Sequence, residues 1–187
     1  IGWSALSAIT EGDSNTVVGY NSGLSITTGI RNVGLGETTL DAVDTGTRNV
    51  AIGANAGSAL TSTSYNIFIG NDAGANATGT GAIGIGHDAL TANTADYSVG
   101  IGYEAGVNLT SGGGNTFMGY RAARSATDSV ASSVAIGYDA MYSNTDSNGN
   151  IAIGYFALRQ GSGGSSRDYN VAIGQDAMRN ANPHMSI

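Results

Sequence analysis

A short phrase of alternating apolar residues recurs along the whole chain. Its clearest copies are 49–53, 150–154 and 170–174, each an Asn followed by Val or Ile, then Ala, Ile and Gly. The final Gly of each copy serves as a marker, and there are eleven: Gly2, Gly19, Gly36, Gly53, Gly70, Gly86, Gly102, Gly119, Gly137, Gly154 and Gly174. Successive markers are 16 to 20 residues apart, most often 17. This period is too short for two-helix repeats and leaves room for two short strands and two turns, so it predicts one coil of a β-solenoid.

The strand of each coil is predicted to be apolar on both faces. In stacked parallel coils, equivalent residues lie above one another about 4.8 Å apart, so each repeat position forms a column. The columns one and three before the marker hold mostly Ile, Val, Leu or Met, and we expect this face to line the inside of the coil. The column between them is mostly small, as at Ala51, Ala135 and Ala152. That face meets either a second wall of the same coil or another copy of the chain. We favour another copy, because a coil of about 17 residues is too thin to cover both faces.

Two further columns predict structural roles. Asn stands four residues before most markers, as at Asn49 and Asn66, where stacked amides can pass hydrogen bonds from coil to coil. Ala stands three residues after most markers, and the next position alternates between Leu or Met and Gly. These columns predict an Asn ladder at one corner and a narrow, tightly packed second segment.

Composition agrees with an all-β, turn-dense chain and limits the possible partners. The 187 residues include 30 Gly and one Pro, and 11% are charged. The net charge of -7 argues against binding to nucleic acid or to an anionic membrane surface. No Cys is present, and no apolar run is long enough for membrane insertion. His87 and His184 are far apart and unpaired in sequence, so we expect no metal site and no cofactor.

The repeats predict one domain. We assign residues 1–182 to the repeat domain and residues 183–187 to a C-terminal cap or the start of a further segment, because Pro183 cannot donate to a strand ladder. The chain opens on Ile1-Gly2, the last two residues of the phrase, so we expect it to be cut from a longer protein.

The segments Val134 to Met141 and Val171 to Met178 carry a family resemblance. Their phrase, Val-Ala-Ile-Gly followed by Tyr-Asp-Ala-Met or Gln-Asp-Ala-Met, resembles the head repeats of trimeric autotransporter adhesins and, more closely, related repeats of bacteriophage tail fibres. The resemblance covers essentially the whole chain. It implies a left-handed parallel β-roll of about eleven coils, with three chains side by side in a virion fibre that attaches to a host-surface glycan or protein. The alternative that it implies is the head of a bacterial cell-surface adhesin; the longer period and the Tyr after the marker favour the fibre.

The position after the marker holds the candidate contact residues. Tyr occupies this position in four successive coils, at Tyr103, Tyr120, Tyr138 and Tyr155. Stacked rings at an exposed edge form either a platform for sugar faces or an aromatic ladder that stabilises the stack.

The position two after the marker reads Asp72, Asp88, Glu104, Arg121 and Asp139 in consecutive coils. We expect Arg121 to lie between Glu104 and Asp139, within reach of both. Such a column also raises the alternative of a glycan-cleaving enzyme, which uses two carboxylates about 5 to 10 Å apart. No coil carries an insertion that would wall a cleft, so we predict no enzyme and no catalytic residues. Ice binding is a third alternative, but the Thr residues cluster in turns of variable length instead of holding one column.

Overall fold

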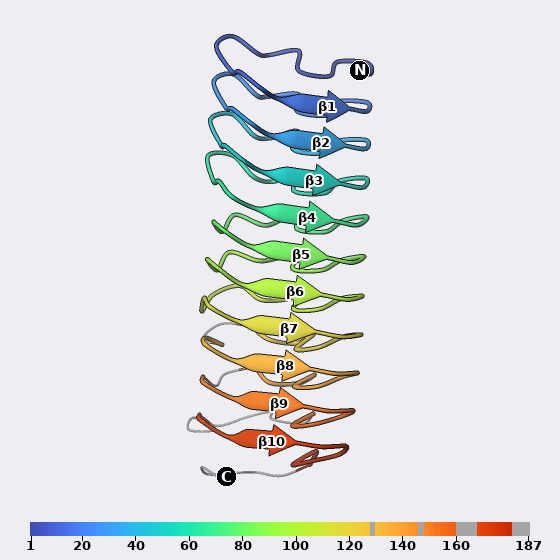
Figure 1. Ribbon diagram of the computed structural model, residues 1–187, viewed down its shortest axis with the longest axis vertical. Helices are drawn as coiled ribbons and strands as arrows, with labels where there is room; N and C mark the ends of the chain where they lie inside the picture. Colours follow the sequence, from blue (N-terminus) through green and yellow to red (C-terminus); the bar gives the residue numbers. More distant parts are fainter. Residues whose placement is uncertain (128–129, 146–147, 160–167, 181–187) are drawn as a thin grey trace.

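Ten short parallel strands form one sheet. The computed structural model describes residues 1–127, 130–145, 148–159 and 168–180. Within these ranges there is no helix, and the strands stack in chain order (Figure 1). They are β1 Thr16–Val18, β2 Val33–Leu35, β3 Val50–Ile52, β4 Ile67–Ile69, β5 Ile83–Ile85, β6 Val99–Ile101, β7 Thr116–Met118, β8 Val134–Ile136, β9 Ile151–Ile153 and β10 Val171–Ile173. The predicted all-β parallel solenoid is confirmed.

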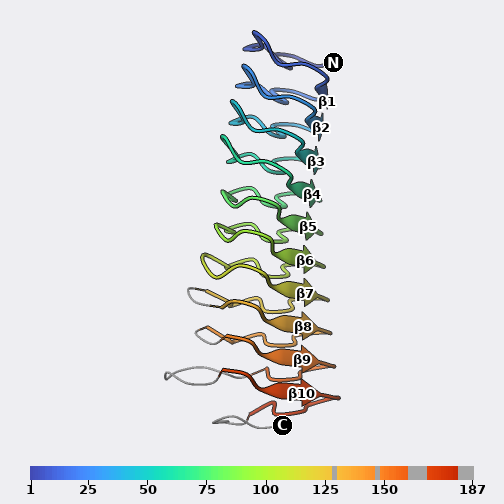
Figure 2. The same ribbon diagram turned by 60° about the vertical axis from the view of Figure 1, so that its left-hand side comes forward.

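The strands pair column on column, as the repeat register predicts. Val50 of β3 lies opposite Val33 of β2 on one side and Ile67 of β4 on the other. The front strands in Figure 1 run left to right while the chain descends, and the turn to Figure 2 moves them to the right-hand side. The coils are therefore left-handed. The first marker has no strand of its own, but the Ile1 carbonyl accepts a 2.8 Å hydrogen bond from the Gly19 amide.

The predicted orientation of the strands is wrong. The middle residue of every strand is buried inside the coil, and Ala51, Ala135 and Ala152 are each 0% exposed. The flanking Ile and Val residues point outward and are half-buried or exposed. The small face therefore meets a second wall of the same coil, and the β-branched face is left uncovered. The physical reason is the thin coil itself, whose two walls lie too close together for a row of Ile and Val side chains.

Large side chains inside the coil lie beside glycines. Phe68 occupies the middle position of β4 at 0% exposure, and glycines surround it. A methyl group on Gly74 or Gly84 would lie 2.5 or 2.8 Å from the Phe68 ring. A methyl group on Gly100 would similarly lie 2.7 Å from Leu90. Large residues and glycine in these columns therefore share one volume, because protein interiors leave little empty space.

The marker glycine is required by backbone geometry. At Gly102, φ is +130°, and an added methyl group would lie 2.3 Å from the carbonyl oxygen of Gly119 in the next coil. Only glycine adopts such a conformation without strain and permits so close an approach. The markers that follow Gly102 in the described coils, except Gly174, are packed against the next marker in the same way.

The predicted Asn ladder is confirmed. The backbone amide of Asn49 donates to Asn32 Oδ1 at 2.9 Å, and the amide of Asn66 donates to Asn49 Oδ1 at 3.0 Å. These side chains are 0% exposed. Each buried amide thus satisfies the backbone of the following coil, which fixes the spacing between coils. The predicted domain end at 182 and the cap at 183–187 lie outside the described residues.

Candidate functional site

The outer face of the sheet is an uncharged apolar stripe. Two outward positions per strand run from β1 to β10, and apart from Thr16 and Thr116 they hold Val, Ile, Leu or Met. Nine steps of about 4.8 Å give the stripe a length of roughly 43 Å. Figure 2 shows the strands aligned along one side of the molecule, with the loops on the other. Continuous exposed apolar surface of this kind is uncommon on monomers and marks an interaction site.

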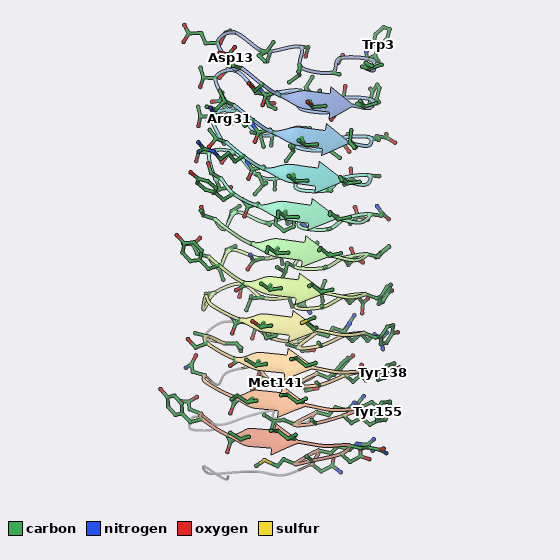
Figure 3. All side chains as sticks on the ribbon, in the orientation of Figure 1. Trp3, Asp13, Arg31, Tyr138, Met141 and Tyr155 are labelled. Atoms are coloured by element: carbon green, nitrogen blue, oxygen red, sulfur yellow. The ribbon has the colours of Figure 1, made fainter. Side chains whose placement is uncertain are left out.

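The tyrosines after the markers form a stacked ladder at one edge. Ring centroids are 5.3 Å apart for Tyr103 and Tyr120, 4.7 Å for Tyr120 and Tyr138, and 5.2 Å for Tyr138 and Tyr155. His87 extends the ladder, with its ring 5.4 Å from that of Tyr103. Figure 3 shows Tyr138 and Tyr155 projecting from the same edge.

Stacking determines what this ladder can contact. The faces of Tyr120 and Tyr138 point along the solenoid axis and are covered by neighbouring rings. A sugar approaching from solvent meets ring edges and hydroxyl groups, whereas stacking on aromatics uses ring faces. This geometry favours a structural ladder, and contact of these four tyrosines with a glycan stays a prediction.

The acidic column is more fully partnered than the sequence suggested. Arg121 Nε lies 3.1 Å from Glu104 Oε2, as expected, and Arg124 Nε lies 2.5 Å from the same oxygen. The expected contact of Arg121 with Asp139 is absent from the described residues, where Asp139 instead pairs with Arg159 at 3.3 Å. Both additional arginines stand five residues after the next marker. The recurring signal was therefore an acid followed 20 residues later by Arg.

The first two acids of this column, Asp72 and Asp88, also have partners. Asp72 accepts a 3.0 Å hydrogen bond from the Asn55 side-chain amide, and Asp88 lies 2.9 Å from His87 Nδ1. No group of three or more His, Cys, Asp or Glu side chains suited to a metal ion occurs in the part of the chain that the structure describes.

Glu104 gives the column a predictable pH dependence. The hydrogen bond from Arg124 is the main cause that lowers the pKa of Glu104 below its ordinary value of 4.5, with both arginine charges acting in the same direction. A lowered folded-state pKa contributes stability above pH 4.5, which is lost as the pH falls through the folded-state value. We expect Glu104→Gln to reduce this acid-dependent loss of unfolding free energy by about 0.2 to 1 kcal/mol.

Chemical denaturation between neutral and acidic pH measures the Glu104 effect. Glu37→Gln is the matched control, because Glu37 is exposed and forms no ion pair with any described residue. Equal pH profiles for wild type and Glu104→Gln would show that the pairing contributes nothing.

A second column of tyrosines, which was not predicted from the sequence, lies five residues before the markers. Tyr65, Tyr97 and Tyr169 are 57%, 70% and 67% exposed. Their φ angles of 64°, 54° and 61° lie in the left-handed region, which bulky residues rarely adopt. Arg31 belongs to this column and lies at the edge opposite Tyr138 in Figure 3. The column could have been found by aligning the residues before the Asn ladder.

Comparison of the chain with protein-family models, curated proteins and solved structures gave no match. Among the described residues, no helix could span a membrane.

Proposed function

We propose that this chain is a structural and attachment segment of a homotrimeric bacteriophage tail fibre that takes part in host-surface recognition. The observation that carries the proposal is the outward apolar stripe of β1 to β10. We propose that other copies of this chain cover the stripe, because a parallel copy repeats the same apolar spacing at every coil. A partner of different fold would have to reproduce that spacing along roughly 43 Å.

The remaining surface supports a binding role for the segment. The carboxylates that suggested glycan cleavage are held by Asn55, His87, Arg121, Arg124 and Arg159. The rigid coil-to-coil hydrogen bonds suit a rod that holds a contact surface away from its anchor. The proposal that the segment belongs to a virion fibre, and that the fibre contains three chains, rests on the family resemblance.

Assembly and attachment together test the proposal. Light scattering at micromolar concentration is expected to give three times the 18.7 kDa mass of one chain. Fluorescently labelled chain is expected to be retained on susceptible bacterial cells. A folded monomer, or a trimer that attaches to no bacterial surface tested, would contradict the proposal.

A further inference from the structure

We infer that the exposed tyrosines five residues before the markers, with the polar groups beside them, form a saccharide-binding edge. This edge, defined by Tyr65, Tyr97 and Tyr169, is called the tyrosine corner below. The inference rests on the proposed attachment function and assigns it a place and a ligand class.

Burial does not explain these tyrosines. Tyr97 is 70% exposed, and the described contacts include no ring stacking or side-chain hydrogen bond for it. The same column holds Gly81, Gly114 and Gly149, which adopt positive φ without a steric penalty. Tyrosine at this position carries backbone strain of about 1 to 2 kcal/mol without compensating burial. Positive φ also occurs in this column at Arg31, Arg48 and Ser132, so it belongs to the repeated turn, and the exposed aromatic ring is the feature that the turn does not require.

The rings are nevertheless held in place. The side of the Tyr97 ring lies over Gly81, where an added methyl group would be 2.7 Å from Cδ1. Tyr169 lies over Gly149 in the same way, at 2.6 Å. The Arg48 guanidinium donates a 2.8 Å hydrogen bond to the Tyr65 hydroxyl. A positioned ring loses less conformational entropy when a ligand binds.

The residue before two of these tyrosines is Asp, and it fastens the corner to the preceding coil. Asp96 Oδ1 accepts the backbone amide of Thr80 at 2.7 Å, and Asp168 Oδ1 accepts the amide of Asn148 at 2.6 Å. Each unit therefore sets an exposed aromatic ring beside a carboxylate. The two equivalent units lie four coils apart, about 19 Å along the axis, and Tyr65 lies two coils, about 10 Å, from Tyr97.

This chemistry fits a saccharide chain. A pyranose ring has an apolar face of C–H groups, which packs on an aromatic face, and a rim of hydroxyls, which bond carboxylate and guanidinium groups. The ladder tyrosines have their faces covered by one another, whereas most of the Tyr97 ring is open to solvent. A repeating polymer can also contact the corner in more than one coil, which raises the overall affinity.

The test uses the full chain on a printed array of bacterial surface polysaccharides. Tyr97→Asn removes the ring but keeps a residue that tolerates positive φ, so the coil is expected to fold. Wild type is expected to bind at least one polysaccharide, and Tyr97→Asn to weaken that binding about tenfold or more, as for loss of an aromatic anchor. Tyr97→Phe should retain it, because the ring face is unchanged.

Tyr20→Asn is the matched control. Tyr20 is 51% exposed and stands in the ladder column, on the opposite edge. Equal losses for Tyr20→Asn and Tyr97→Asn would overturn the inference, as would no binding by wild type. A lower Tm with unchanged binding for Tyr97→Asn would assign the ring to covering Gly81 and also overturn it.

Cell attachment separates this inference from the proposed function. Loss of attachment by Tyr97→Asn, together with loss after periodate oxidation of the cell-surface sugars, would support the saccharide corner. A trimer that still attaches after Tyr97→Asn would overturn the corner and leave the fibre function standing. Attachment that needs Tyr97 but survives periodate would identify a protein receptor and overturn the saccharide.

Discussion

Replacing Gly102 with alanine is expected to disrupt the solenoid at its centre. The new methyl group would lie 2.3 Å from the Gly119 carbonyl oxygen, and φ is +130°. Backbone strain of about 1 to 3 kcal/mol and overpacking of about 1 to 3 kcal/mol together lower the unfolding free energy by roughly 2 to 6 kcal/mol. Domains are stable by only about 5 to 15 kcal/mol, so a large fall in Tm is expected in circular dichroism.

Gly174→Ala separates the two causes at Gly102. Gly174 has φ of +120° in the same column, but an added methyl group would meet no described residue within 4 Å. This variant should show the backbone strain without the clash, about 1 to 3 kcal/mol. If the two variants lose equal stability, the contact between successive coils is not what requires glycine at the marker.

Replacing Ile101 with aspartate is expected to convert the proposed trimer into folded monomers. Ile101 lies near the middle of the apolar stripe, on the outward face of β6. In the assembly the change would bury an unpaired carboxylate in every chain, at a penalty of several kcal/mol for each. Each 1.4 kcal/mol changes an equilibrium constant tenfold, so light scattering at micromolar concentration should return the mass of one chain.

Val107→Asp is the matched control for assembly. Val107 is half-buried, and its column, five residues after the markers, includes Arg124 and Arg159, so this face is polar. We expect this variant to keep the wild-type mass. A trimer that survives Ile101→Asp would show that the stripe is not the interface. A substitution in the small column, such as at Ala152, would not test the interface, because Ala152 lies inside the coil and a larger side chain there would disrupt the fold itself.

Most of the architecture follows from the repeat. Strand positions, parallel pairing and register can be predicted because every coil repeats the same residues at nearly the same spacing. Val50, for example, is bound to lie between Val33 and Ile67 once the coils stack. The Asn ladder follows similarly, since an amide at the same place in each coil can satisfy the next coil's backbone.

The properties of the candidate surfaces could be predicted less completely than the fold, because they depend on three-dimensional geometry. The tyrosine ladder could be located from Tyr103 to Tyr155, but only the stacked rings show that their faces are covered. The pairing of Glu104 with Arg124 joins two different columns, so only the 20-residue spacing that Asp139 and Arg159 repeat could have indicated it. Likewise, the exposure of Tyr97 depends on which corner its column occupies.

By itself, the sequence determined a parallel β-solenoid, its register and its structural columns, because a covalent repeat forces equivalent residues into equivalent places. Only the tertiary structure decided which strand face is inside. Both faces are apolar, so hydrophobicity could not choose between them. The short coil brings its walls close together, and the buried middle position of each strand holds Ala or Gly, apart from Val17, Phe68 and Phe117. Ile and Val are therefore left on the surface, where the assembly interface is proposed.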